Sequence, residues 1–279
     1  MPSAKLFFAI ALGFGGLTLS PLASAEGQLS LGVGVQGHSW KEYVNGTDRT
    51  LLEETGPRYT MNLAYDTFHR RSEGLVYGVE ALGFVGELDY EGTLVDTTTQ
   101  ANSSTLYLGS DTRITLGYRR FSGSARWAFD WTGGLGYSAW GRKIEDGTDV
   151  NGAPFSGYTE TYSVFYGHLG AGLFRRGALW DQYLQFGFKH PIDITEQVEE
   201  PFNVELEPGA NTSFYLTWNF YHKDVDGGRN YAVTLYIDSF RFSSSPAVQS
   251  PFSVGGNNLF FQPKSDYNVF GLRLTRYFQ

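Results

Sequence analysis

Cysteine is absent from this chain of 279 residues. Its absence excludes disulfide bonds, thiolate metal sites and cysteine nucleophiles. Long apolar runs are also absent, because no segment after residue 25 has the ~18 uninterrupted apolar residues that a spanning helix needs. This excludes a helical membrane protein, but it leaves open a protein that crosses a membrane with strands, in which only alternate residues face lipid.

Basic residues are scarce relative to acidic ones, 21 against 29, and the formal net charge is −8. An acidic surface repels polyanions, so we expect neither nucleic acid nor another polyanion as a main partner.

The first 25 residues have the pattern of an export signal. A short basic start, Met1 to Lys5, precedes an apolar run from Leu6 to Leu19, and Ala23-Ser24-Ala25 forms a small-x-small cleavage site. We therefore predict a cleaved signal peptide over residues 1–25 and a single domain over residues 26–279. The alternative is an N-terminal membrane helix.

The last segment of the chain alternates apolar and polar residues with period 2. Its apolar face holds Phe270, Leu272, Leu274 and Phe278, and its other face includes Arg273 and Tyr277. Such alternation is typical of a strand with one apolar and one polar side. The same design recurs along the chain, and glycine (35 residues) and aromatic residues (16%) are abundant throughout.

The repeated alternation predicts an all-β protein, a ten-stranded antiparallel up-and-down transmembrane β-barrel. Long connections alternate with short turns, so the long loops share one end of the barrel and the short turns the other. The expected strands are Gln28–Trp40, Pro57–Phe68, Gly74–Leu88, Thr105–Arg120, Trp127–Gly141, Tyr158–Phe174, Gln182–Pro191, Asn211–His222, Asn230–Ser243 and Asp266–Gln279.

Alternation alone also fits a soluble barrel with its apolar face inward. Three features favour the transmembrane orientation: long strands, charged residues confined to one face, and aromatic residues near the strand ends. The aromatic residues that we expect at the membrane interfaces are Trp127, Trp140, Tyr158, Trp180, Tyr221, Tyr231, Tyr277 and Phe278.

Across residues 26–279 the chain resembles the outer-membrane β-barrel proteins of Gram-negative bacteria. The export signal, the amphipathic strands and the aromatic ending Tyr277-Phe278 carry this resemblance. It implies location in the outer membrane, contact with outer-membrane lipid, and recognition of the C-terminal strand by the barrel-assembly machinery. The chain departs from the usual closing signature because Gln279 follows Phe278 and Arg276 interrupts the apolar face.

Ten strands and a similar length are also found in the omptin proteases. Their active-site pattern, an acidic pair with an Asp-x-His element at the outer rim, is absent here. The nearest candidates are Asp89, Glu160, His190 and Asp193. No histidines have metal-ligand spacing on one strand, so the sequence indicates no catalytic residue, metal site or cofactor.

Charged residues of both signs fall on the faces that point into the predicted lumen. We expect Glu80 opposite Arg113, Asp238 diagonal to Arg273, and Arg119, Asp130 and His168 together near the periplasmic end. A ten-stranded barrel is narrow, and charges inside it should pair. The hypothesis is a lumen plugged by salt bridges; the alternative is a gate or proton-sensitive site at Arg119, Asp130 and His168. The whole expected lumen network is Glu80, Asp111, Arg113, Arg119, Asp130, His168, Lys189, Asp238 and Arg273.

The expected outer loops are acidic and aromatic, with Glu53-Glu54, Asp89 to Glu91, Glu196 to Glu207, Phe252 and Phe260-Phe261. They are either the surface that binds an extracellular ligand, partner or cation, or solvated caps over the lumen. The sequence thus favours a non-enzymatic outer-membrane barrel. Its alternatives are a narrow channel or transporter for small solutes and an omptin-like hydrolase.

Overall fold

The computed structural model describes residues 27–44, 47–68, 73–93, 99–123, 126–199, 201–223, 229–254 and 257–278. The predicted signal peptide, residues 1–25, lies outside these ranges, and so does Gln279. No helix within them is long and apolar enough to cross a membrane.

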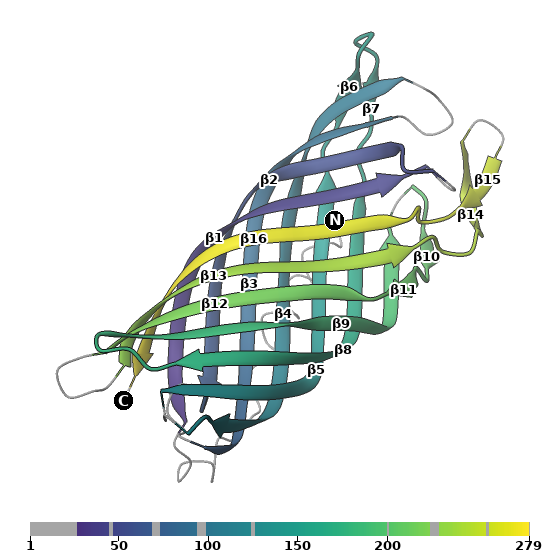
Figure 1. Ribbon diagram of the computed structural model, residues 1–279. Coiled ribbons are helices and arrows are strands. Elements are labelled where there is room, and N and C mark those ends of the chain that lie inside the picture. Colours follow the sequence, from purple (N-terminus) through teal and green to yellow (C-terminus); the bar gives the residue numbers. More distant parts are fainter. Residues whose placement is uncertain are drawn as a thin grey trace.

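Ten long antiparallel strands form a closed barrel (Figure 1), as the sequence predicts. Each strand pairs with its neighbour in the chain, β1 pairs with the last strand, and β3 pairs with β4, which completes the ring. The strands are β1 (Gln28–Tyr43), β2 (Thr50–Asp66), β3 (Gly74–Thr93), β4 (Gln100–Phe121), β5 (Trp127–Ile144), β8 (Thr159–Arg175), β9 (Trp180–Val198), β12 (Ser213–Lys223), β13 (Arg229–Ser243) and β16 (Ser265–Phe278).

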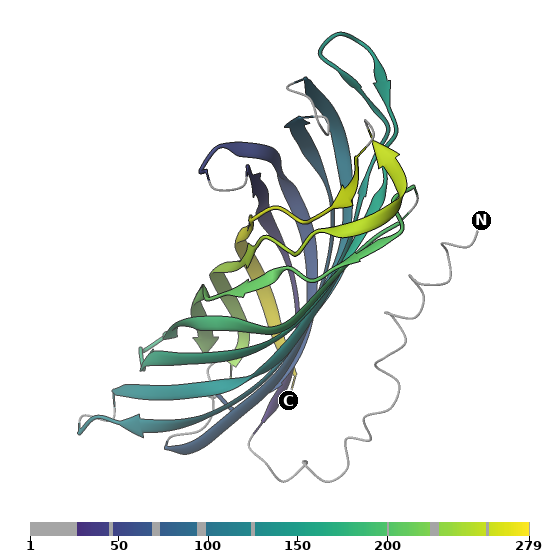
Figure 2. The ribbon, with the colours of Figure 1, turned by 90° about the vertical axis from the view of Figure 1, so that its right-hand side faces the viewer.

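Short strands lie at one end of the barrel, which we call the loop end (Figures 1 and 2). The opposite end has the short turns and the C-terminus, and we call it the turn end. The hairpin β14–β15 at the loop end is called the cover below. The short strands are β6 (Gly147–Asp149), β7 (Pro154–Phe155), β10 (Val204–Leu206), β11 (Gly209–Asn211), β14 (Val248–Val254) and β15 (Asn257–Phe260).

Several strands reach further toward the loop end than predicted. Most of the expected loops over residues 41–56 and 89–104 belongs to β1, β2, β3 and β4, and β9 continues to Val198. Five acidic residues that we expected in loops therefore lie on long strands, and two of them, Glu54 and Glu196, point into the barrel; the five are Glu53, Glu54, Asp89, Glu91 and Glu196. The expectation that they are loop residues was wrong.

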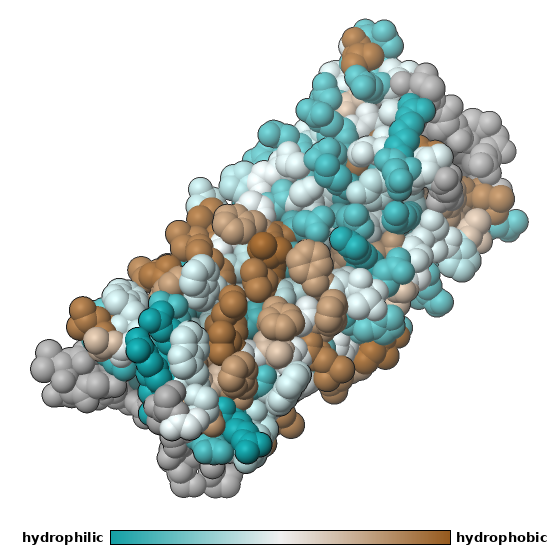
Figure 3. All heavy atoms as spheres, in the orientation of Figure 1, coloured by the Kyte–Doolittle hydropathy of each residue, from teal (hydrophilic) through white to brown (hydrophobic). Residues whose placement is uncertain are grey.

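An apolar band surrounds the half of the barrel nearer the turn end (Figure 3). The apolar face of β16 lies in this band, as predicted, while Tyr277 points inward. Exposed members of the band include Leu31, Val33, Met61, Leu63, Ile114, Leu116, Phe129, Trp131, Leu135, Leu169, Phe186, Phe188, Trp218, Phe270, Leu272, Leu274 and Phe278.

Above the apolar band, toward the loop end, the polarity of most of the wall is reversed. Trp40 and Ile144 point into the barrel and are buried, while Asp89, Lys143 and Gln197 point outward. Along most strands the alternation continues without a shift, so the same parity faces inward over the whole strand. β9 is the exception, because a bulge at Ile192 moves its inward residues from odd to even positions and turns Glu196 into the barrel. The upper wall is therefore built like that of a soluble barrel, with an apolar interior and a polar exterior.

This reversal corrects part of the expected interfacial aromatic belt. Trp140, Tyr221 and Tyr277 are buried in the lumen, whereas Trp180, Tyr231 and Phe278 are exposed. Position near a strand end was a weaker signal than parity, because parity decides which side of the wall a residue occupies.

Inward tyrosines lie flat across glycines of the neighbouring strand. A Cβ atom on Gly136 would stand 2.2 Å from Cζ of Tyr166, and one on Gly271 would stand 2.1 Å from Cζ of Tyr236. Each glycine is the direct cross-strand neighbour of its tyrosine. The glycines thus make room for large side chains in a narrow lumen, which accounts for part of the abundance of both residue types.

Candidate functional site

Aromatic side chains cross the lumen at the loop end. Trp140 stacks on Tyr162, with ring centroids 5.0 Å apart and planes 8° from parallel, and lies 5.3 Å from the ring of Tyr267. Trp40 lies 5.2 Å from Tyr162. We call the full set the outer plug: Trp40, Tyr107, Trp140, Tyr162, Phe240, Phe242 and Tyr267, with the charged residues Glu42, Glu54, Arg142, Glu160 and Glu196.

Arg142 lies at the centre of the outer plug with its side chain fully buried. Its guanidinium contacts three carboxylates: Nη1 lies 3.1 Å from Glu42, Nε 3.0 Å from Glu160, and Nη2 3.7 Å from Glu54. The partners come from β1, β2 and β8, and Arg142 comes from β5. One guanidinium therefore ties together walls of the barrel that are distant in sequence.

Neutral donors complete the hydrogen bonding of these carboxylates. Glu54 accepts a 2.7 Å hydrogen bond from Thr105 and a further one from the Tyr107 hydroxyl. The Tyr162 hydroxyl donates to Glu160 at 3.1 Å, and the indole N–H of Trp40 donates to Glu42 at 2.8 Å.

Glu196 is the fourth carboxylate of the outer plug and is fully buried. No ion pair joins it to a basic side chain among the described residues. With the Gln262 amide nitrogen turned toward it, that amide donates to both carboxylate oxygens, at 3.0 and 3.1 Å. Gln262 precedes β16 in the connection from the cover, so Glu196 is in contact with the segment that closes the loop end.

Burial raises the pKa of the Glu160 carboxyl to about 7; Arg142 opposes this increase, and Glu42 and Glu54 add to it. Burial, followed by repulsion from Glu160 and Glu42, also raises the pKa of Glu196 well above its ordinary value. Both residues lie beyond the apolar band, where the outer face is polar. A proton can therefore remain on this pair near neutral pH.

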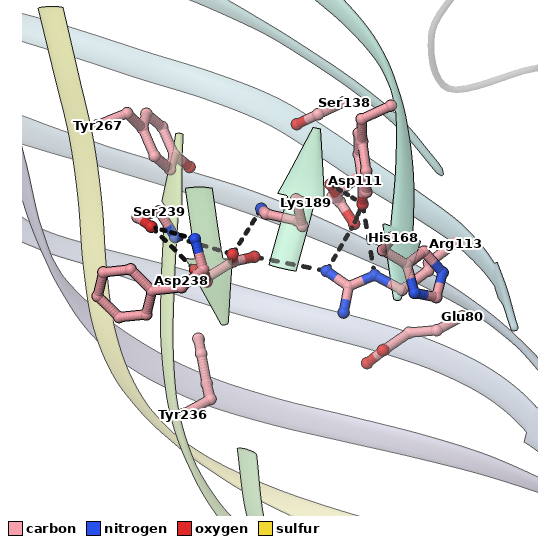
Figure 4. Close-up of polar contacts among 12 residues, drawn as sticks. Glu80, Asp111, Arg113, Ser138, His168, Lys189, Tyr236, Asp238, Ser239 and Tyr267 are labelled. Atoms are coloured by element: carbon pink, nitrogen blue, oxygen red, sulfur yellow. Dashed lines mark hydrogen bonds and ion pairs between the residues drawn. The ribbon is translucent and has the colours of Figure 1, made fainter. Parts of the chain in front are cut away.

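A second layer of charges lies below the outer plug (Figure 4). The Lys189 ammonium lies 2.5 Å from Asp238, and Arg113 lies 3.4 Å from Asp238 and 3.8 Å from Asp111. Asp111 also accepts a hydrogen bond from the Tyr166 hydroxyl at 3.0 Å. We call Glu80, Asp111, Arg113, Lys189, Asp238 and Arg273 the middle cluster.

We expected two pairs of opposite charge in this layer, and the structure confirms the position of one and contradicts the other. The strand register places Glu80 directly opposite Arg113, as predicted, yet the carboxylate of Glu80 pairs with Arg273 at 2.5 Å. Asp238 is not diagonal to Arg273, because Arg273 pairs in register with Thr234 and Asp238 with Val269. That expectation was wrong, since the long connection between β13 and β16 does not fix their register.

The third layer lies near the turn end and consists of Arg119 and Asp130, which are register partners. Both side chains are fully buried, and Nη2 of Arg119 lies 2.6 Å from Asp130. Arg119 also donates to the backbone carbonyl of Phe68, and its guanidinium lies 4.6 Å from the ring centroid of Phe174. We call this the inner pair.

His168 does not join the inner pair, so the expected triad was wrong. It is opposite Gly134 and Lys189 in the register, whereas Asp130 is opposite Gly172, four residues further along β8. Its Nε2 atom lies 3.2 Å from the carbonyl of Ile114. The histidine therefore belongs to the level of the middle cluster.

A polar cavity of about 120 Å³ lies between the middle cluster and the turn end. Glu80, Arg113 and Arg273 border it on one side, and Tyr183 and Tyr277 on another. Its remaining walls carry mostly hydroxyl and amide side chains. The cavity has room for several water molecules or one small polar solute.

The residues closest to an omptin-like pattern do not converge. Asp89, His190 and Asp193 are exposed on the outer face of the wall, and Glu160 is buried in the outer plug. His190 contacts Thr212 at 3.2 Å. The described residues also contain no group of three acidic or histidine side chains arranged to hold a metal ion.

Sequence reasoning missed the most densely connected group, Arg142 with Glu42, Glu54 and Glu196. A usable signal was present: Trp40-Lys-Glu42 and Trp140-Gly-Arg142 continue the inward parity of their strands with alternating aromatic and charged residues. We expected polar residues inside and apolar residues outside, and so the reversed pattern was interpreted as loop.

Comparison with known proteins bears on the fold. No family model matches the chain, and no curated protein sequence matches it. The outer membrane protease OmpT of Escherichia coli superposes with a TM-score of 0.54 at 10% identity, over 90% of this chain and 96% of that chain. The fold is that of an outer-membrane β-barrel.

Two further solved structures are similar at lower scores. The transport unit of the autotransporter AIDA-I from Escherichia coli has a TM-score of 0.47 at 9% identity, over 98% of this chain and 96% of that chain. An outer membrane channel from Pseudomonas putida F1 has a TM-score of 0.41 at 12% identity, over 90% and 96%.

Proposed function

We propose that this protein is a non-enzymatic outer-membrane barrel that is closed to solutes and presents its loop end as a surface for binding. The observation that carries the proposal is the outer plug, in which Arg142 and Trp140 are fully buried across the lumen. Catalysis is not part of the proposal, because Asp89, Glu160, His190 and Asp193 do not converge on one site.

The apolar band supports a position in the outer membrane. A band of exposed leucine, valine and aromatic residues would be costly in water, and barrels of this kind carry an apolar belt of ~25 Å. In this orientation β16 ends on the periplasmic side, available to the barrel-assembly machinery, and the cover lies outside the cell.

Three layers of paired charges support a closed lumen. The outer plug, the middle cluster and the inner pair lie at successive depths, and each contains an arginine that bridges strands. Side chains nearly fill a barrel of this size without help from a loop. Breaking a buried ion pair leaves a charge unpaired and costs roughly 3–5 kcal/mol, so these layers resist thermal opening.

A narrow channel for small solutes is the second candidate, and the polar cavity is the observation that favours it. The cavity is lined by groups suited to water and polar solutes. Passage would require the outer plug to move, because its aromatic side chains lie between the cavity and the loop end.

Conductance of the refolded protein in a planar bilayer tests the proposal. We expect no steady conductance from the wild type at pH 6, frequent openings from Arg142→Ala, and none from Lys143→Ala. Lys143 is the matched control, because it is the next residue on β5 and points outward. Steady ion-selective steps from the wild type would instead establish the channel.

A further inference from the structure

The outer plug contains more acidic than basic charge. Four carboxylates, those of Glu42, Glu54, Glu160 and Glu196, surround the single guanidinium of Arg142, and all of these side chains are buried. At short range in a water-poor interior, like charges repel strongly. One arginine cannot compensate four ionised carboxylates.

Among the residues that the structure describes, no other basic side chain forms an ion pair with these carboxylates. Arg58 lies nearby on β2, but its guanidinium donates to the Tyr267 hydroxyl at 2.7 Å and packs 4.1 Å from the ring centroid of Phe84. His38 is also buried, and burial, followed by repulsion from Arg58 and Arg142, lowers its pKa well below the ordinary value. The titratable groups that interact with the carboxylates are Tyr90 on β3, Tyr107 on β4, Arg142 on β5, Tyr158 just before β8 and Tyr162 on β8. His38 on β1 and Arg58 on β2 interact with Arg142 and Tyr107 of the same group.

Glu196 is the carboxylate best placed to hold a proton, and Glu160 is the carboxylate linked to it. Glu42, Glu54 and Glu160 each have one contact with Arg142, whereas Glu196 has none among the described residues. The Tyr162 hydroxyl bonds Glu160, and Tyr162 is the direct register partner of Glu196 on the neighbouring strand. The raised pKa of each carboxyl, described above, agrees with this geometry.

Glu196 also connects this pair to the structures that close the loop end. It pairs in register with Leu206 of β10, and its carboxylate meets the amide of Gln262. Gln262 is buried. Its backbone N–H donates to the Ser245 hydroxyl, and its carbonyl accepts a hydrogen bond from the Ser245 N–H. These two bonds fix the base of the cover. The ring of Phe260 in the cover lies 4.3 Å from that of Phe202.

We propose that the outer plug is a proton-dependent lock in which one proton, held between Glu160 and Glu196, keeps the cover seated on the barrel. Loss of that proton adds a negative charge to a group already rich in carboxylates. Repulsion then separates β9 from Arg142 and its partners, and the contact from Glu196 to Gln262 is lost. The lock rests on the proposed closed barrel and adds a regulated opening to it.

Pulsed electron paramagnetic resonance measures the position of the cover directly. The chain has no cysteine, so Leu259→Cys on the cover and Thr55→Cys on the outer wall of β2 give two unique spin-label sites, both exposed in the native protein. We expect one narrow distance distribution at pH 6, and a longer and broader one at pH 9. An identical distribution at both pH values would overturn the lock.

Glutamine variants identify the groups that titrate. The double variant Glu160→Gln with Glu196→Gln should keep the narrow distribution from pH 6 to pH 9, because neither side chain can ionise. Glu207→Gln, at an exposed position in the same connection, should respond as the wild type does. A double variant that still opens at pH 9 would refute the assignment; if it fails to fold by circular dichroism, Glu196→Gln alone provides the same test.

The bilayer measurement separates failure of the lock from failure of the closed barrel. If the wild type shows no conductance at pH 6 and its cover does not respond to pH, the proposal of a closed barrel stands and the proposal of a lock is refuted. If the wild type conducts steadily at pH 6, the proposal of a closed barrel is refuted, whatever the cover does.

Discussion

The two halves of the barrel wall have opposite polarity, although the same strands form both. Near the turn end, Leu135 and Phe129 point outward and Asp130 points inward. Near the loop end, Trp140 and Ile144 point inward and Lys143 points outward. Parity never changes along β5, and only the polarity assigned to each side reverses. The medium outside the wall, hydrocarbon in one half and water in the other under the proposed placement, accounts for the reversal.

The difference also appears in how each half holds its charges. The inner pair is balanced, with one arginine and one aspartate in direct contact. The middle cluster is balanced as well, with three basic and three acidic side chains. The outer plug is not balanced, and only this layer depends on pH in our proposal. Under this proposal, a closed lumen combines two layers that do not depend on pH with one layer that does.

The largest expected effect comes from Arg142→Ala. The change leaves four buried carboxylates without their shared cation, so we expect the free energy of unfolding to fall by about 4 kcal/mol. Urea unfolding in detergent micelles measures it. Lys143→Ala is the control and should change the value by less than about 0.5 kcal/mol. Equal effects of the two changes would contradict the contrast between the inside and the outside of the wall.

Removal of the inner pair should have the next largest effect. Arg119→Ala should lower the free energy of unfolding by about 3 kcal/mol, because Asp130 is left buried and unpaired. In a double-mutant cycle, Arg119→Ala with Asp130→Ala should cost less than the sum of the two single changes. The exposed neighbour Arg120→Ala is the control. Additive costs would mean that the pair is not coupled.

A methyl group added at Gly136 should disturb the lumen where Tyr166 lies across it. A Cβ there would overlap the tyrosine ring, so we expect Gly136→Ala to cost about 2 kcal/mol. Gly37→Ala is the control, because its nearest neighbour is a carbonyl oxygen at 3.9 Å. Thermal unfolding followed by circular dichroism compares them. A neutral Gly136→Ala would show that Tyr166 has free space to move.

The smallest expected effect is a pH dependence that belongs to the outer plug. Burial raises the pKa of Glu160 from its ordinary 4.5 to about 7, so the folded state keeps a proton that the unfolded chain releases in this window. The free energy of unfolding should therefore decrease as the pH rises from 4.5 to 7.

Urea unfolding at a series of pH values checks this slope. Glu160→Gln should flatten the decrease between pH 4.5 and 7, because its amide does not titrate. Glu207→Gln should leave the slope unchanged. A wild type whose stability rises through this window would mean that Glu160 is ionised in the folded protein.

The sequence was sufficient to predict the architecture and much of the lower wall. Alternation in β16 identified Phe270, Leu272 and Leu274 as outward residues because the strand period is fixed by backbone geometry. Local pairing was also predictable where a short turn sets the register, as for Arg119 and Asp130 across the turn between β4 and β5. Short turns leave little freedom in the alignment of the strands that they join.

Tertiary structure alone decided which charges meet across the lumen. Glu80 pairs with Arg273, and Arg142 meets Glu42 of β1 and Glu54 of β2, through closure of the ring rather than through adjacency in sequence. Only Glu160, the register partner of Arg142 on the neighbouring strand, is a local contact. Two-residue periodicity tells which side of the wall a residue faces, and it contains no information about what stands on the opposite wall. Barrel diameter and strand stagger set that distance, and they are properties of the closed sheet as a whole.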